Sequence, residues 1–249
     1  MKNKSNSAVI LLSGGQDSTT CLAWAKTKFD KVYALTLHYG QLHKIELESA
    51  KKIAKLNKVP LKIYKTDLFK EFTKNALINK EIAIEAPKNK LPSTFVPGRN
   101  LIFLSIAAIY AKQLGITNII TGVCQTDYSG YPDCRDDFVK SLETTISLAM
   151  ETPFKIHTPL MWLTKAETVK LMQQLGKIEL LKYSHTCYKG SRPACGKCPA
   201  CLLRLKGFKE AGIKDPIKYV DGKIQKDLQI RICARAQEID LTNNMSNNQ

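Results

Sequence analysis

The stretch AVILLSGGQDSTTCL at residues 8–22 decides the fold of this chain. Residues 8–12 form a continuous apolar run, as expected of a strand that is buried on both faces of a parallel sheet. The run ends in the tight loop Ser13-Gly14-Gly15, and residues 18–28 then carry apolar side chains at helical spacing. The stretch therefore predicts a strand, a tight loop and a helix in direct succession.

The alternation of apolar runs and helical patterns continues along the chain. Further strands are expected at residues 31–37, 61–64 and 118–123, and further helices at residues 45–57, 101–114, 136–150, 164–175 and 202–211. Thr164 as N-cap and Glu167 as its partner form a capping box. Residues 68–95 interrupt the pattern and are expected to be an inserted excursion or a flexible loop near the carboxyl edge of the sheet. The pattern indicates an α/β fold with a parallel sheet and flanking helices.

The loop between the first strand and the first helix is suited to bind phosphate. Its backbone N–H groups lie at a helix N-terminus, where unpaired donors and the helix dipole both favour an anion. Gly14 and Gly15 let the backbone approach a ligand closely. Ser13 and Ser18 add hydroxyl donors, and Asp17 can hold the Mg²⁺ that accompanies nucleotide phosphates. The GKS or GKT ending of a Walker A loop is missing.

Four of the eight cysteines are crowded into one short segment, in the spacing C-x7-C-x2-C-x2-C. They are Cys187, Cys195, Cys198 and Cys201. In a chain without the marks of a small secreted protein, such crowding favours a metal over disulfides. Four thiolates complete the tetrahedral shell of a structural Zn²⁺ and leave no position for water. The alternatives are an iron–sulfur cluster, which no redox feature elsewhere in the sequence supports, and thiols without a ligand.

Residues 124–135, CQTDYSGYPDCR, follow a predicted strand at the position where open α/β sheets bind ligands. Its tyrosines can stack on a flat heterocycle, its aspartates can accept hydrogen bonds from a guanine-like edge, and its arginine can pair with a carboxylate. The candidate substrate-binding residues are Gln125, Asp127, Tyr128, Tyr131, Asp133 and Arg135. The alternative is an ordinary Gly/Pro loop with tyrosines packed beneath it.

A second loop, FVPGRN at residues 95–100, precedes a predicted helix. Its last two residues, Arg99 and Asn100, lie where they can face a nucleotide, and a plain helix start is the competing account.

The composition fits one globular domain, or one domain with a small appendage, because the chain has 249 residues of which 44% are hydrophobic. The apolar runs at residues 8–12 and 101–111 are too short for a signal peptide core or a bilayer span, so a cytoplasmic location is the default expectation. The formal net charge is +16, yet only six of the 38 basic residues are arginines and the lysines are spread along helix faces. Most of this charge is therefore interpreted as solvated surface.

The string SGGQDS resembles the SGGxDS signature of the ATP pyrophosphatase, or PP-loop, family, whose members cleave ATP between the α- and β-phosphates. Pro159, Leu160, Lys165 and Glu167 match the second phosphate motif of that family. The resemblance implies an adenine nucleotide alpha hydrolase-like, Rossmann-like sheet and catalytic roles for Asp17 and Lys165. The ATP-binding residues that it implies are Leu12, Ser13, Gly14, Gly15, Gln16, Asp17, Ser18, Thr19, Thr20, Cys21, Leu22, Arg99 and Asn100.

Within the PP-loop enzymes, the order of motifs resembles the 7-cyano-7-deazaguanine synthase family of queuosine biosynthesis. The motifs are SGGQDSTTCL, HYGQ.H at residues 38–43, FVPGRN, GVCQTDYSGYPDCR and the cysteine array, and the resemblance covers residues 8–219. It implies an ATP-dependent ligase that converts 7-carboxy-7-deazaguanine and ammonia to the nitrile with Mg²⁺, a structural Zn²⁺ and a homodimeric assembly. No nucleic acid or membrane is required. His43, Asp127 and Asp133 are the candidates for deprotonating ammonium.

Two other functions compete with this one. The first is a PP-loop enzyme that modifies tRNA directly, as a lysidine-type or thiolating enzyme, with the basic surface as its docking site. The second is a zinc-bearing nucleic-acid-binding module without catalysis, which leaves the phosphate loop unexplained. The expected organisation is an ATP-binding α/β domain at residues 1–180, a zinc-binding helical or ribbon region at 181–220, and an extension at 221–249 whose end is expected to be disordered.

Overall fold

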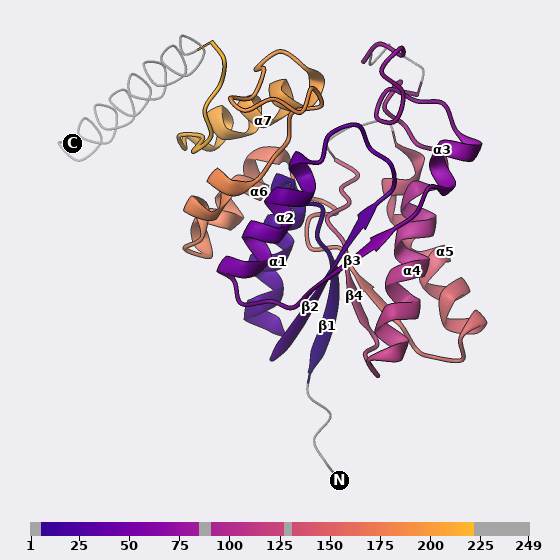
Figure 1. Ribbon diagram of the computed structural model, residues 1–249. Helices are drawn as coiled ribbons and strands as arrows, with labels where there is room; N and C mark the ends of the chain where they lie inside the picture. Colours follow the sequence, from indigo (N-terminus) through magenta and orange to yellow (C-terminus); the bar gives the residue numbers. More distant parts are fainter. Residues whose placement is uncertain (1–5, 85–90, 127–130, 222–249) are drawn as a thin grey trace, which may run out of the picture.

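The computed structural model describes residues 6–84, 91–126 and 131–221. Within them, one five-stranded parallel sheet has the strand order β3-β2-β1-β4-β5 (Figure 1). The strands are β1 (Ser7–Leu11), β2 (Lys31–His38), β3 (Leu61–Lys65), β4 (Asn118–Ile120) and β5 (Lys155–His157). The chain moves outward from β1 through β2 and β3 and then returns to place β4 on the other side of β1. The crevice beyond the carboxyl ends of β1 and β4 is therefore the expected ligand site.

Helices cover both faces of the sheet, with α1 and α2 on one side and α4 and α5 on the other (Figure 1). These helices are α1 (Gln16–Lys28), α2 (Ile45–Leu56), α4 (Arg99–Gln113) and α5 (Asp136–Ala149). Ile10 of β1 packs in the core that contains Leu22 and Ile53. Its neighbour Val9 packs in the opposite core, with Leu104 and Leu142. Because successive side chains of a strand point to opposite faces, the apolar run of β1 fills both cores at once.

The C-terminal part of the described chain contains α6 (Lys165–Gln174), the 3-10 helix η2 (Ile178–Tyr183) and α7 (Pro199–Ala211). A buried ion pair fastens the segment after α7 to that helix. Arg204 Nε lies 2.8 Å from Asp215 Oδ2, and both side chains are 1% exposed. The hydroxyl of Tyr219 donates to the same carboxylate oxygen at 2.6 Å. This network fixes the position of α7 beside the cysteine segment.

The predicted α/β fold is confirmed, and each predicted strand and helix is present with ends that differ by a few residues. Helix α1 begins at Gln16 rather than at residue 18, because Gly15 in an extended conformation serves as its N-cap. Strand β5 was not expected, since it places only one apolar residue, Ile156, between Lys155 and His157. The strand predicted at 118–123 is shorter than expected.

The described part of the interrupting segment at 68–95 packs against neighbouring elements. It contains the short helix α3 (Leu68–Phe72), and Phe69 packs in a small core with Tyr39 and Val96. The 3-10 helix η1 (Pro132–Cys134) lies in the loop before α5. Residues 222–249 of the predicted extension lie outside the described residues. Among the helices that the structure describes, none is both long and apolar enough to cross a membrane.

Candidate active site

The loop after β1 is shaped by close contact with α2. Gly14 has a φ of +85°, and a Cβ at this position would lie only 2.4 Å from the carbonyl oxygen of Glu46. Its own carbonyl accepts a hydrogen bond from the backbone N–H of His185 at 2.9 Å. Glycine is therefore required here both for the backbone conformation and for the space. The loop is held between α2 and the segment that leads to the cysteines.

At the start of α1, two serines of this loop contact each other and the aspartate contacts Lys165. Ser13 Oγ lies 3.0 Å from Ser18 Oγ, and the backbone N–H of Gly15 donates to Ser13 Oγ at 3.3 Å. Asp17, in the first helical turn, receives two hydrogen bonds from Lys165 Nζ at 2.9 and 3.0 Å. Lysine and carboxylate thus meet at a helix N-terminus, where both can contact an anion and its metal ion.

Lys165 is positioned by two helices. It is the first residue of α6, directly after Thr164, whose side chain accepts from the N–H of Glu167 to complete the predicted capping box. In α7, Gly207 leaves room for the lysine chain, since a Cβ at Gly207 would lie 2.5 Å from Lys165 Cγ. The side chain of Lys165 is only 11% exposed, so its ammonium group is directed toward Asp17 rather than toward bulk solvent.

A cavity of about 350 Å³ opens at the carboxyl ends of β1 and β4. The predicted nucleotide or substrate residues on its wall are Leu12, Ser13, Gly15, Gln16, Asp17, Ser18, Arg99, Asn100, Tyr131 and Lys165. Gln16 is 4% exposed, and its Nε2 has no hydrogen-bond partner among the described residues. A buried amide without a partner is unfavourable, so Gln16 Nε2 is suited to donate a hydrogen bond to a ligand in this cavity.

Other residues from the predicted ATP set lie behind the cavity wall. Thr19 Oγ1 donates to the carbonyl of Gly15, and Thr20 Oγ1 donates to that of Gln16. Cys21 and Leu22 are fully buried in the core beneath α1. These residues, together with Gly14, support the loop from behind, and their contact with ATP stays a prediction.

The residues predicted to bind the substrate do not all lie at the cavity. Asp127 and Tyr128 lie outside the described residues. Gln125 Oε1 accepts from the backbone N–H of Asp136 at the start of α5, and the exposed Arg135 is the N-cap residue of that helix. Neither forms part of the cavity wall.

Tyr131 and Asp133 from the same loop occupy different positions. Tyr131 is on the wall, where its hydroxyl lies 2.6 Å from Thr94 Oγ1 and its ring stacks on Phe95 at 5.8 Å between centroids. Asp133 is buried behind the wall, where its Oδ2 accepts from the backbone N–H of Asn100 at 3.1 Å. The carboxylate of Asp133 therefore stabilises the first turn of α4.

The wall also contains Tyr39, Glu46 and Tyr188, which are ionisable residues that sequence reasoning did not assign to the site. Burial raises the pKa of the Glu46 carboxyl to about 7, an effect that the nearby positive charge of Arg99 partly offsets. Burial also raises the pKa values of Tyr39 and Tyr188. The motif at residues 38–43 was the available signal, because it contains Tyr39 and ends three residues before Glu46.

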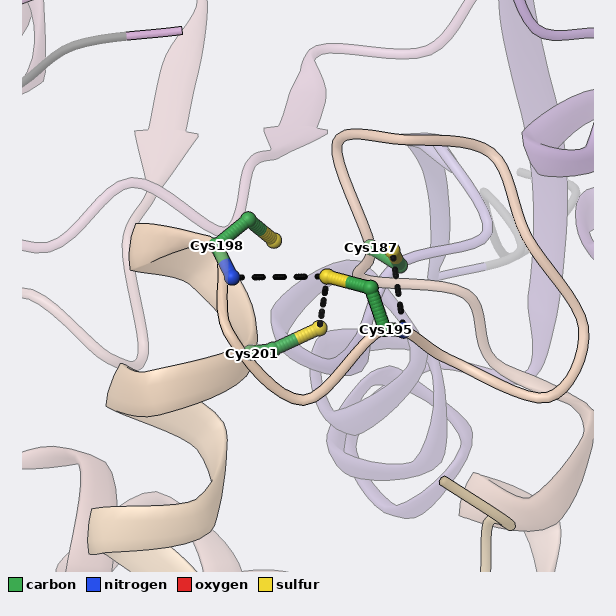
Figure 2. Close-up of side chains that lie close together, drawn as sticks. All are labelled: Cys187, Cys195, Cys198 and Cys201. Carbon is green, nitrogen blue, oxygen red and sulfur yellow. Dashed lines mark hydrogen bonds between the residues drawn. The ribbon is translucent and has the colours of Figure 1, made fainter. Parts of the chain in front are cut away.

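The four cysteines of the predicted metal site converge on one point (Figure 2), and their sulfur atoms all lie within 4.8 Å of one another. Cys195 Sγ and Cys201 Sγ are 3.9 Å apart. A zinc tetrathiolate with bonds of about 2.3 Å has sulfur–sulfur edges of roughly 3.8 Å. The backbone N–H groups of Cys195 and Cys198 donate to Cys187 Sγ at 3.4 Å and to Cys195 Sγ at 3.3 Å. Such bonds stabilise thiolates, so the site fits Zn²⁺.

His185 is not among these ligands. Its Nε2 lies 2.9 Å from the carbonyl oxygen of Cys187, which holds the ring against the backbone of the cysteine segment. Burial lowers the pKa of this imidazole, which favours its neutral form. His185 therefore packs the segment onto the phosphate loop.

Comparison with known proteins identifies relatives over most of the chain. Residues 7–212 match the family described as queuosine biosynthesis protein QueC. The chain is 54% identical to the 7-cyano-7-deazaguanine synthase of Bacillus subtilis (strain 168), over 83% of this chain and 95% of that protein. It is 52% identical to the synthase of the same name from Chromobacterium violaceum, over 84% of this chain and 92% of that protein.

Solved structures are less similar. An NH3-dependent NAD synthetase from Campylobacter jejuni aligns at a TM-score of 0.43 and 20% identity, over 72% of this chain and 67% of that chain, which assigns no function. The family match, by contrast, spans the phosphate loop, Lys165 and all four clustered cysteines. The chain belongs to the family of queuosine biosynthesis protein QueC.

Proposed function

We propose that this chain is a 7-cyano-7-deazaguanine synthase, a ligase that uses ATP to convert 7-carboxy-7-deazaguanine and ammonia to the nitrile. The observation that carries this function is its identity of 54% to a synthase of that name, along 95% of the relative. The geometry supports it, because the phosphate loop and Lys165 face one cavity that also presents tyrosines and a carboxyl group. Such a cavity suits a nucleotide and a flat polar heterocycle together.

The reaction must overcome the poor leaving ability of a carboxylate oxygen. In the proposed first half, that oxygen attacks the α-phosphorus of ATP, and the bond to the β-phosphate oxygen breaks to release pyrophosphate. Ammonia then attacks the acyl carbon, AMP leaves, and a proton is lost to give the primary amide. In the second half, the amide oxygen attacks the α-phosphorus of a second ATP, and the bond to the β-phosphate oxygen breaks to release a second pyrophosphate. Loss of AMP and two protons from nitrogen then forms the C≡N bond.

The residues of the loop and α6 are assigned to the phosphates. Backbone N–H groups of the loop, with the hydroxyls of Ser13 and Ser18, would bind the departing pyrophosphate. The ammonium group of Lys165, which lies 2.9 Å from Asp17, would offset the charge that develops on it. Asp17 would hold Mg²⁺, which supplies further charge neutralisation on the phosphates when bound.

The cysteine cluster is assigned a structural role. With four thiolates the coordination of Zn²⁺ is complete, so that no position remains for a substrate or a water molecule. Four clustered cysteines that serve as thiolate ligands are typical of a reducing compartment. This composition supports a cytoplasmic enzyme.

The experiment that tests this function is a product assay in the absence of tRNA. Purified protein with 7-carboxy-7-deazaguanine, ammonium, Mg²⁺ and ATP is expected to form the nitrile and to release AMP and pyrophosphate, as measured by mass spectrometry and nucleotide chromatography. An absolute requirement for tRNA would contradict the proposal and would favour direct tRNA modification.

A further inference from the structure

Glu46 is an acidic residue on the cavity wall that the proposed mechanism does not use. It lies in the first turn of α2, and its backbone carbonyl packs against Gly14 of the phosphate loop. In the part of the chain that the structure describes, no hydrogen bond or salt bridge holds its carboxyl group. Glu46 is half-buried, and a carboxyl partly removed from water without a partner is stabilised when a ligand supplies hydrogen-bond donors.

The surroundings of Glu46 suit a flat heterocycle. Tyr39, Tyr131 and Tyr188 contribute phenol rings to the same cavity. The guanidinium group of Arg99 is hydrogen-bonded to the hydroxyl of Tyr39, and its positive charge acts on Glu46. Aromatic faces allow stacking, while a carboxyl and a guanidinium group in one cavity offer both acceptors and donors to a polar ring edge.

The other two candidate acidic residues already have hydrogen-bond or ion-pair partners within the protein. Asp17 is paired with Lys165 at 2.9 Å, and Asp133 accepts from the backbone of Asn100 at 3.1 Å behind the wall. Among the described wall residues, this leaves Glu46 as the carboxyl that is available to a second substrate. His43 and Arg204 also lie on the wall, but a neutral or positive side chain cannot replace an anionic acceptor.

The base of the proposed substrate presents two neighbouring hydrogen-bond donors, the ring N1–H and the exocyclic 2-amino group. The two oxygens of one carboxylate can accept both hydrogen bonds at once. Adenine has no such pair of donors on its pairing edge. We infer that Glu46 is the specificity-determining residue that binds the N1–H and 2-amino edge of the deazaguanine. This inference rests on the proposed function and extends it by naming the side chain that recognises the deazaguanine base.

The test compares two substrates and two variants. The substrates are 7-carboxy-7-deazaguanine and its analogue without the 2-amino group, and the variants are Glu46→Gln and the matched control Glu48→Gln. Glu48 is exposed and lies in the same first turn of α2. Steady-state kinetics with each substrate and with ATP give the KM values, while thermal unfolding and zinc content establish that each variant is folded.

For the native protein, loss of the 2-amino group is expected to lower kcat/KM by roughly 10- to 100-fold, the range for a hydrogen bond to a charged group. Glu46→Gln is expected to raise the KM for 7-carboxy-7-deazaguanine by a similar factor, to narrow the preference between the two substrates, and to change the KM for ATP less than about threefold. Glu48→Gln is expected to resemble the native protein in every respect.

Three outcomes would overturn the inference. A rise in the KM for ATP alone would place Glu46 on the nucleotide, and a fall in kcat with both KM values unchanged would make it a general base. Equal kcat/KM values of the native protein for both substrates would show that the 2-amino group is not recognised. This comparison uses the native protein alone, so it does not depend on the folding of a variant. If the native protein forms no nitrile at all, the proposed function fails, which is a different result from any of these.

Discussion

The contact between Asp17 and Lys165 links the two halves of the phosphate site at the residue scale. Lys165 Nζ bonds both carboxylate oxygens of Asp17, at 2.9 and 3.0 Å, and the Asp17 side chain is 34% exposed toward the cavity. Under the proposed function, the ammonium group would act on a phosphate and the carboxylate on its Mg²⁺.

Asp17→Asn is therefore expected to abolish most ATP turnover without loss of the fold. The amide keeps an oxygen for Lys165 but loses the negative charge that Mg²⁺ requires, so kcat should fall by about 100-fold or more. Release of AMP measures the activity, and thermal unfolding measures the fold. Asp137→Asn is the matched control, since Asp137 is an exposed acid in the first turn of α5. Full activity of Asp17→Asn would exclude Asp17 from the metal site.

The carboxyl group of Glu46 makes the stability of the ligand-free protein depend on pH. Burial raises its pKa from 4.5 to about 7, against the opposing charge of Arg99, with Tyr39 and Tyr188 as further neighbours. Between these pH values the folded protein binds more protons than the unfolded chain. The contribution of Glu46 to the free energy of unfolding therefore falls as the pH rises, by at most about 1.4 kcal/mol per pH unit.

Glu46→Gln removes this contribution. The free energy of unfolding of the variant, measured relative to the native protein by denaturant titration, is expected to increase steadily from pH 5 to pH 7 and then to level off. Glu48→Gln should give no such trend. A difference between Glu46→Gln and the native protein that does not change over this range would show that Glu46 is ionised throughout.

At the residue scale, the sequence predicted what its motifs contain. Asp17 and the clustered cysteines belong to short patterns with a defined chemistry, and the structure brings the members of each together. Glu46 was missed because an acid in the first turn of a helix is common for electrostatic reasons alone. Only the packing of α2 against Gly14 places it on the cavity wall.

At the element scale, α7 connects the cysteine cluster with Lys165. Cys198 is its N-cap residue, Pro199 begins it, and Gly207 contacts the side chain of Lys165. Zinc that orders the start of α7 would therefore also order the surface against which Lys165 packs. We therefore expect the predicted metal site and the predicted phosphate site to be coupled through this helix.

Cys198→Ala is expected to lower both the zinc content and the thermal stability, because metal binding is part of folding for thiolate sites. Elemental analysis and calorimetry measure the two effects. Cys21→Ala is the control, because Cys21 is buried in a core away from the cysteine cluster. This variant should lose some packing energy but retain its full zinc content. Iron and inorganic sulfide in cluster proportions in the native protein would contradict the zinc assignment.

Gly207→Ala gives a test of the contact between α7 and Lys165. In a free helix this change stabilises by about 1 kcal/mol, but here the new Cβ would lie 2.5 Å from Lys165 Cγ. We expect a less stable protein with a higher KM for ATP. Lys209→Ala, on the exposed side of α7, should leave both unchanged. A stabilised Gly207→Ala variant with normal kinetics would refute the contact.

Hydrophobic periodicity predicted most of the helices and strands. Strands β1 and β2 carry apolar runs that are typical of buried parallel strands, and the capping box predicted the start of α6. Strand β5 was not predicted because three residues with one apolar side chain carry no periodic signal. Its existence depends on pairing with β4, which is a tertiary effect.

At the scale of the whole molecule, the sheet order brings distant segments to one crevice. The phosphate loop follows β1, Cys124 follows β4, and Lys165 follows β5 by a short connection. The sequence predicted the parallel sheet but not which strands are neighbours, so it could not place Glu46 and Lys165 in the same cavity. The formal net charge of +16 remains compatible with a solvated surface, since the proposed reaction needs no nucleic acid.

The central claim is that this single cavity activates a free deazaguanine carboxylate twice, at the expense of two ATP molecules for each nitrile. The most direct measurement is the ratio of AMP to nitrile formed by the purified protein without tRNA, with pyrophosphate determined in parallel. The account predicts two AMP and two pyrophosphate for each nitrile, with the amide as an intermediate in brief reactions. Release of ADP and phosphate, or no nitrile until tRNA is added, would contradict it.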